Sequence, residues 1–286
     1  MTAAGAPARS GVALGRERYR SDRARRSTAV ALLSALVAVA VVVALVVSSP
    51  GWPRVRESFL SLSAARESVG PILSGLWLNI RILVVAEVLV LLFGLLLALA
   101  RTVRGAVALP LRAAAAAYTD VFRGLPLIIL LYLVGFGLPA LRLQGVPNDP
   151  VLLGGLAIVL TYTAYVAEVF RAGIDSVHPS QRLAARSLGL SHRQTLRIVV
   201  LPQAVRRVLP PLLNDFVALQ KDVGLVSVLG AVDAVRQAQI AQSLSYNFTP
   251  YVVAGLAFIV LAVPSARVAH AVGRRAQRRE QAGGVV

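Results

Sequence analysis

The chain has 286 residues, 57% of them hydrophobic, and its mean hydropathy of +0.71 excludes an ordinary soluble domain. Its formal net charge is +17, almost entirely from arginine, and basic loops beside anionic lipid headgroups explain this charge better than nucleic-acid binding does. The absence of cysteine excludes disulfides and thiolate metal ligands.

The first part of the chain predicts a basic tail followed by a membrane helix. Residues 1–28 are polar and rich in arginine, so we expect a poorly ordered cytoplasmic tail. The apolar run 29–48 is long enough to cross a bilayer, and Pro50 and Pro53 end it. Because this run lacks a small-residue cleavage site, we interpret it as an N-terminal transmembrane helix and not as a signal peptide. The mixed-charge segment 54–70 is expected outside the membrane.

Five further stretches predict transmembrane helices. They lie at 76–100, 112–137, 151–170, 204–222 and from 251 to just beyond 263. The second of these five is broken at Gly124-Leu-Pro126, and such a break requires protein neighbours or a water-filled cavity. Residues 223–248 alternate apolar and polar groups and predict an outer, interfacial helical segment. The sequence therefore predicts an all-α, polytopic integral membrane protein with about six transmembrane helices.

The distribution of arginine predicts the orientation. Arginine is concentrated in the segments 1–28, 101–112, 171–207 and 276–286. The loop 140–150, by contrast, holds only Arg142. Because basic residues gather on the cytoplasmic side, six spans with both termini in the cytoplasm satisfy every loop. We expect a multi-pass protein of the cell membrane with basic cytoplasmic tails at both ends.

The loop 172–202 between two of the predicted spans is too polar to cross the membrane. Pro179 predicts the start of a short helix, and Gly189 predicts the left-handed turn that ends it. Ser191 can cap a second short helix, which we expect to end at Pro202. Two short helices around a glycine are typical of a surface that a membrane protein presents to a partner.

This loop resembles the cytoplasmic "EAA" loop of ABC importer permeases. The shared pattern is Ala184-Ala185, three residues, Gly189 and then Leu201-Pro202, and Leu183 stands where the family has glutamate. Wider runs, Ala167 to Ile174 and Leu201 to Arg207, resemble the polar amino-acid uptake branch of these type I permeases. The likeness covers residues of about 70–275.

The resemblance implies a five-helix type I permease domain at 70–275, to which the helix 29–48 is added. It also implies a second permease subunit (identical or paralogous), ATPase subunits that dock on the 172–202 loop, and an extracytoplasmic solute-binding protein. ATP and Mg²⁺ would be held by the ATPase, so no cofactor and no enzymatic activity are expected on this chain. We call residues 172–202 the coupling loop. Its expected contact residues are Leu183, Ala184, Ala185, Leu188, Gly189, Leu201 and Pro202.

The chain offers no pattern for an active site. It lacks the Gly-x4-Gly-Lys-Ser/Thr loop that holds nucleotide phosphates. Its histidines, His178, His192 and His270, are scattered outside the predicted spans, so we expect no metal site. No serine is flanked by a recognisable His/Asp pair.

Polar residues within or beside the spans are the candidates for a solute pathway. A charge at bilayer depth costs about 2.5–3.5 kcal/mol and needs a partner or water. Asn214 and Lys221 fall on one helical stripe, and Asp215 and Asp222 fall on another. The candidates are Arg123, Glu168, Arg171, Asn214, Asp215, Gln220, Lys221 and Asp222.

Structural roles remain open for several of these candidates. Lys221 and Asp222 can lie at the outer boundary and reach the headgroups, Glu168 and Arg171 can pair at the inner boundary, and Arg123 can simply mark the helix break. We expect Tyr162, Thr163 and Tyr165 to pack and to form interhelical hydrogen bonds.

An ion-coupled transporter or channel for a small polar solute, working without partners, is the alternative interpretation. It would also account for charges inside the membrane. It has no evident need of the coupling loop, which favours the permease. The sequence leaves open which amino acid is carried.

Overall fold

The computed structural model describes residues 11–103 and 105–283, without the side chains of 11–26, 192 and 276–283. Residues 1–10 and 284–286 of the two predicted tails lie outside the described residues. The described part of the chain forms helices and turns and contains no strand, which confirms the all-α class. It divides into two compact units, one ending at Glu57 and the other starting at Ser58.

The first unit contains helix α1 (Gly11–Val47) and most of α2 (Trp52–Phe59). Residues 11–28 belong to α1, so the prediction of a poorly ordered tail is wrong for this part. Arginine, alanine and leucine are good helix formers, and the apolar run that follows lets the helix extend backwards through them. Ser27–Val47 is long and apolar enough to cross a membrane, and none of its side chains is buried.

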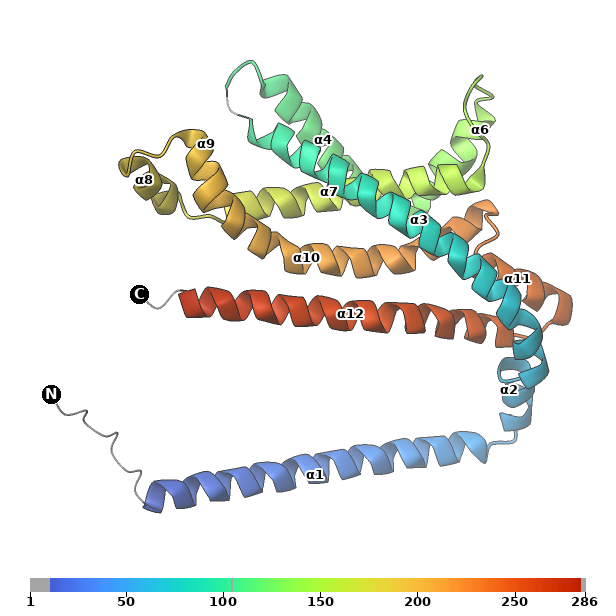
Figure 1. Ribbon diagram of the computed structural model, residues 1–286. Coiled ribbons are helices and arrows are strands. Elements are labelled where there is room, and N and C mark those ends of the chain that lie inside the picture. Colours follow the sequence, from blue (N-terminus) through green and yellow to red (C-terminus); the bar gives the residue numbers. More distant parts are fainter. Residues whose placement is uncertain (1–10, 104, 284–286) are drawn as a thin grey trace. The chain divides into compact units, whose positions relative to one another are not determined.

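The second unit consists of helices joined by short connections (Figure 1). In chain order they are α3 (Leu62–Thr102), α4 (Leu109–Gly124), α5 (Leu127–Tyr132), the π-helical η1 (Leu133–Gly137), α6 (Leu138–Ala140), α7 (Pro150–Asp175), α8 (Pro179–Ser187), α9 (His192–Gln194), the π-helical η2 (Thr195–Val200), α10 (Leu201–Asp222), the 3-10 helix η3 (Val223–Leu229), α11 (Ala234–Ser245) and α12 (Thr249–Gly283).

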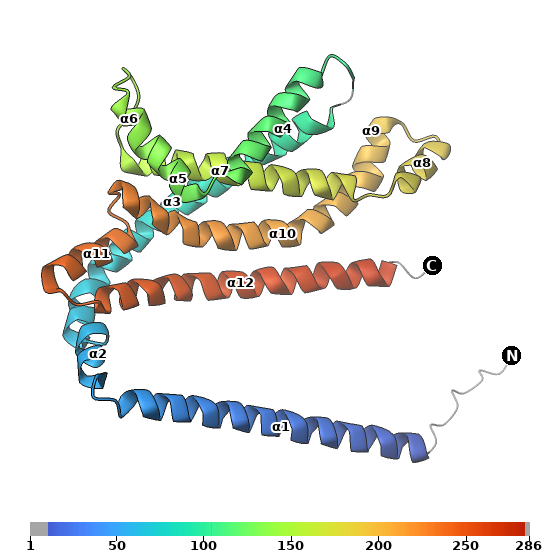
Figure 2. The same ribbon diagram turned by 180° about the vertical axis from the view of Figure 1, so that it is seen from behind.

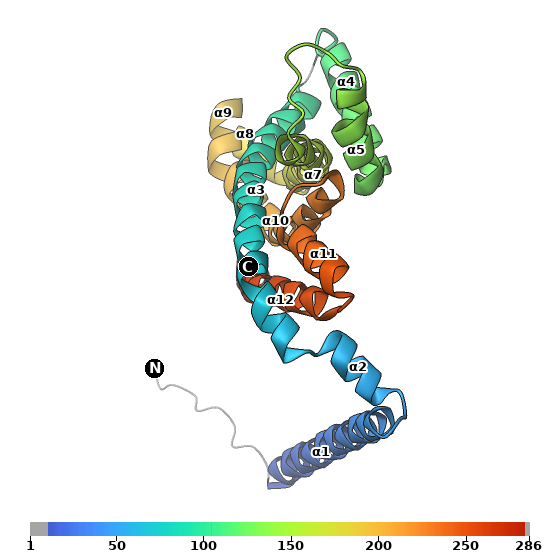
Figure 3. The same cartoon turned by 90° about the vertical axis from the view of Figure 1, so that its right-hand side faces the viewer.

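Helix α3 packs along α7, and α10 packs against both α7 and α12 (Figures 1 and 2). Figure 3 shows α4 and α5 at one end of this unit and α11 and α12 at the other, with α7 and α10 between them. Ile82 of α3, Ile158 of α7 and Leu219 of α10 meet in the main apolar core. A Cβ on Gly94 would come 2.7 Å from Cγ1 of Val166, so the close approach of α3 and α7 depends on this glycine.

Judged by length and composition, fewer helices can cross a membrane than the sequence predicted. In the described residues, four helical stretches are long and apolar enough to cross a membrane, or five when the pair 109–124 and 127–140 counts as one. That pair is bent by 103° at the predicted Gly-Leu-Pro break. Helix α10 does not qualify, because Arg206, Arg207 and three further charged residues lie within it. The fold confirms a polytopic membrane protein, but not the exact count of six.

The predicted interfacial segment 223–248 is helical, as expected, but its acidic residue is fully buried. Asp233 caps α11 and accepts hydrogen bonds from the Arg236 N–H at 2.8 Å and from Nδ2 of Asn79 at 2.9 Å. Asn79 also donates to the carbonyl of Val223 and accepts from the N–H of Ala234. Burial raises the pKa of the Asp233 carboxyl, while these donors act in the opposite direction. This network fixes α11 and η3 against α3.

Candidate functional site

The coupling loop has the predicted helix–glycine–helix form in its first half. His178 caps α8 by accepting a hydrogen bond from the Ser180 N–H at 3.2 Å. Gly189 has a φ of +82°, and the Leu190 N–H donates to the Ala185 carbonyl at 3.2 Å, which closes the helix with a left-handed turn. Ser191 Oγ then accepts from the Gln194 N–H, as predicted for the next cap.

The second half of the coupling loop differs from the prediction. The helix that starts at His192 does not end at Pro202 but continues through η2 directly into α10. Pro202 lies in the first turn of α10, where the missing backbone N–H of proline is tolerated. The change from π-helical to α-helical geometry at Leu201 creates this position, and the sequence alone does not reveal it.

The exposed face of α8 is also different from the expected one. Ala185 is only 5% exposed and packs inside the chain, so it does not belong to an outward contact face. Leu183 is 62% exposed and Leu188 83% exposed, and Ala184 and Gly189 are exposed beside them. Leu201 and Pro202 are exposed as well. An apolar surface among arginines is typical of a protein-binding site.

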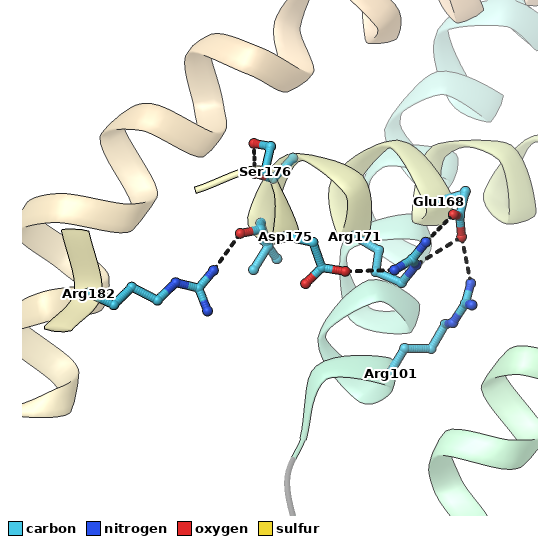
Figure 4. A network of polar contacts seen from close by, with 8 residues as sticks. Arg101, Glu168, Arg171, Asp175, Ser176 and Arg182 are labelled. Atoms are coloured by element: carbon cyan, nitrogen blue, oxygen red, sulfur yellow. Dashed lines mark hydrogen bonds and ion pairs between the residues drawn. The ribbon is translucent and has the colours of Figure 1, made fainter. Parts of the chain in front are cut away.

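Ion pairs join the ends of α3 and α7 at the base of the coupling loop, and a hydrogen bond ties α8 to α7 (Figure 4). Glu168 accepts from Arg101 of α3 at 2.8 Å and from Arg171 on its own helix, and Arg171 also pairs with Asp175 at 2.6 Å. Arg182 of α8 donates to the carbonyl of Ile174 at 2.6 Å. The structure therefore places Glu168 and Arg171 in a network at the base of the loop, where they join α3 to α7.

A polar cavity of about 300 Å³ lies between the helix break, α7 and α10. Asp215 and Asp222 of the predicted pathway line it, and Tyr162 donates to Oδ2 of Asp222 at 2.7 Å. The guanidinium of Arg123 lies 5.6 Å from the ring centroid of Tyr165, another lining residue. The lining residues are Leu125, Pro126, Leu127, Thr161, Tyr162, Tyr165, Asp215, Ala218 and Asp222.

Several buried polar atoms around α10 have no hydrogen-bond partner in the described part of the chain. Oδ2 of Asp215 and Oγ1 of Thr161 belong to residues that line the polar cavity. Both side-chain polar atoms of Gln220 are also unpaired, although Gln220 is only 1% exposed and does not line the cavity. Buried polar atoms are normally satisfied by protein, water or ligand. The polar cavity is therefore suited to a polar solute.

The remaining pathway candidates lie elsewhere on α10. Asn214 and Lys221 are exposed and do not line the polar cavity. The structure thus separates the two stripes that the sequence predicted: Asp215 and Asp222 face the cavity, and Asn214 and Lys221 face outward.

Some lining residues were missed or assigned a different role by the sequence. Tyr162 and Tyr165 form the expected interhelical hydrogen bonds, to Asp222 of α10 and to the Arg123 carbonyl of α4, but they also line the polar cavity, which was not predicted. Half-buried Glu87 of α3 does not line the cavity and was not among the predicted residues, although it is an acidic residue of a membrane helix. An acidic residue in an otherwise apolar span is the signal that could have identified it.

Comparison with known proteins identifies the family of the chain. Residues 91–278 match the family described as the binding-protein-dependent transport system inner membrane component. The chain belongs to this family. The permease is 35% identical over 219 residues to the arginine transport system permease protein ArtQ of Bacillus subtilis (strain 168), covering 76% of this chain and 97% of the relative.

Other relatives are named for the transport of different solutes. The permease is 35% identical to the putative glutamine transport system permease protein GlnP of Rickettsia conorii (strain ATCC VR-613 / Malish 7), over 66% of this chain and 85% of the relative. It is 33% identical to the L-cystine transport system permease protein TcyB of Bacillus subtilis (strain 168), over 74% of this chain and 90% of the relative.

Solved structures agree with the fold. A chain in the crystal structure of an amino acid ABC transporter with histidines matches with a TM-score of 0.69 at 33% identity, covering 75% of the permease and 98% of that chain. A chain of the MetNI methionine ABC transporter shares the fold, with a TM-score of 0.57 at 17% identity. The match covers 72% of the permease and 95% of that chain.

Proposed function

We propose that the permease imports a polar amino acid through the polar cavity, driven by ATP hydrolysis on a separate subunit. The observation that carries this proposal is the buried Oδ2 of Asp215, which has no hydrogen-bond partner among the described residues and lies beside the Tyr162–Asp222 hydrogen bond. The ammonium group of an amino acid can satisfy such an oxygen with a charge-assisted hydrogen bond. Relatives named for arginine, glutamine and L-cystine transport support a polar amino acid as the solute.

The partners follow from the same proposal. ATPase subunits, which hold ATP and Mg²⁺, dock on the exposed face of the coupling loop around Leu183 and Leu188. A second permease subunit completes the membrane part, and an extracytoplasmic solute-binding protein delivers the solute. Membrane lipid surrounds the apolar helices.

Both termini lie in the cytoplasm in this proposal, because the arginine-rich segments must share one side of the membrane. A reporter fused after Arg275 and a reporter inserted in the coupling loop should both give a cytoplasmic signal. A reporter near Asn148 should give an outside signal. A cytoplasmic signal at Asn148 would contradict this orientation.

The function is tested by uptake of radiolabelled arginine, glutamine and cystine into proteoliposomes that contain the permease, its ATPase and its binding protein. Asp215→Asn removes one of the two carboxylates that line the cavity, and a hydrogen bond to a charged group contributes about 1.5–3 kcal/mol, so uptake should fall roughly ten- to a hundredfold. Asn214→Ala, on the exposed face of the same helix, should transport normally.

Normal uptake by Asp215→Asn at normal membrane abundance would contradict the assignment of the cavity. Uptake that needs an ion gradient but no ATPase would instead identify a transporter that works without partners.

A further inference from the structure

A second hollow lies between α3 and α7, apart from the polar cavity. It has a volume of about 440 Å³ and is lined by apolar side chains of both helices and by one charged residue, Arg81. We call it the apolar groove. Its floor includes buried Ile82, Ala86 and Val159, and exposed Val85 and Leu156 form its rims. Both helices are apolar and long enough to cross the membrane, so the groove lies at a depth where hydrocarbon can fill it.

A glycine creates room in the apolar groove. Gly155 lies in the lining, and a Cβ built on it would have no atom within 4 Å. The space above Gly155 is therefore left open by the fold. Protein interiors contain few such voids, and apolar space at the protein surface in a bilayer is filled by hydrocarbon.

Arg81 places a positive charge at one end of the groove. Its side chain is exposed and forms no hydrogen bond or ion pair with the described residues. Val151 and Leu152, which line the groove with it, belong to the first turn of α7, where that helix enters the membrane. An arginine near a helix end reaches the headgroup region, where lipid phosphates lie.

We propose that the apolar groove is a binding site for one anionic phospholipid, with an acyl chain along α3 and α7 and the phosphate on Arg81. The groove residues from Leu78 to Phe93 span about 22 Å of α3 at the helical rise, enough to follow an acyl chain through its leaflet of the roughly 30 Å core. A protein occupant would have to bury the charge of Arg81, whereas a lipid phosphate pairs with it in the headgroup region.

The test measures lipid retained by the intact permease complex in native mass spectrometry after incubation with phosphatidylglycerol or phosphatidylcholine. The wild type should retain phosphatidylglycerol with roughly a fivefold preference, the effect expected of one basic residue near an anionic surface. Arg81→Gln should retain less phosphatidylglycerol than the wild type and bind phosphatidylcholine equally well, so its preference should be weaker. Gly155→Leu should fill the groove and lose the retained lipid of both kinds.

A matched control is available on another membrane helix. Gly255 of α12 also has no atom within 4 Å of an added Cβ, so Gly255→Leu adds the same volume away from the groove and should retain lipid as the wild type does. Both glycine variants should reach the membrane at normal abundance.

Specific outcomes would overturn the proposal. They are equal retention of the two lipids by the wild type, an unchanged preference in Arg81→Gln, and unchanged retention in Gly155→Leu. Disulfide-linked dimers of Leu156→Cys would also overturn it, because they would show that a second copy covers the groove; the absence of native cysteine makes this readout clean. None of these measurements depends on transport.

Discussion

The turn of the coupling loop is made by near neighbours in sequence, whereas the polar cavity is made by segments that are far apart. In the loop, Gly189, Ser191 and the hydrogen bond between Leu190 and Ala185 set the geometry. In the cavity, residues 125–127, 161–165 and 215–222 meet only after α7 and α10 pack. The loop presents apolar groups outward and the cavity holds polar groups inward. Substitutions in the loop should therefore lower ATPase binding and uptake together, whereas substitutions in the cavity should lower uptake and leave ATPase binding unchanged.

Leu188→Asp should have the largest effect and should lower uptake only through the loss of ATPase binding. Leu188 is 83% exposed, so a charge there leaves the fold intact but introduces an uncompensated charge into the proposed ATPase contact. Central interface residues contribute about 2–4 kcal/mol, and pull-down of the ATPase should fall at least about thirtyfold. Leu244→Asp is the control, because Leu244 is 80% exposed on α11, and should bind normally. Normal binding by Leu188→Asp would show that the ATPase does not contact this part of the coupling loop.

Tyr162→Phe should have the second-largest effect and should lower uptake without changing ATPase binding. It removes the 2.7 Å hydrogen bond to Asp222, and bonds to charged groups contribute about 1.5–3 kcal/mol, so uptake should fall by roughly ten- to a hundredfold. ATPase pull-down should be unchanged. Tyr165→Phe loses only a 3.4 Å bond to a backbone carbonyl and should have a weaker effect. Equal losses in the two variants would mean that the cavity does not depend on the Asp222 contact.

Gly189→Val should have a moderate effect confined to the coupling loop. The space around an added Cβ is open, so the penalty comes from the φ of +82°, about 1–2 kcal/mol for a residue with a side chain. ATPase-coupled uptake should fall roughly five- to thirtyfold by the corresponding Boltzmann factor. Gly189→Asn should be milder, since asparagine tolerates this region. If both variants behaved like the wild type in coupled uptake, the turn would not be required.

Leu183→Glu should have the smallest effect. Leu183 is 62% exposed, and glutamate is the residue that the family motif has at this position, so neither the fold nor ATPase pull-down should change by more than about twofold. A large loss of pull-down would show that the contact requires an apolar side chain at position 183 and does not accept glutamate there.

The sequence by itself determined the all-α membrane class, the helix break at Pro126, the left-handed turn at Gly189 and the cap at Ser191. Each of these depends on a local property: an apolar run, the missing N–H of proline, the conformational freedom of glycine, or a serine hydroxyl that can accept from a backbone N–H. The association of Asp215 and Asp222 on one stripe also followed from helical spacing alone.

Only the tertiary structure decided which stripe of α10 faces the cavity and which lining residues surround it. Tyr162 and Tyr165 became lining residues because α7 turns them toward the helix break, and Ala185 became buried because α8 folds back on η2. Pro202 did not end its helix because η2 places it in a first turn. These outcomes depend on contacts between segments distant in sequence, whose energies are not encoded in any local pattern.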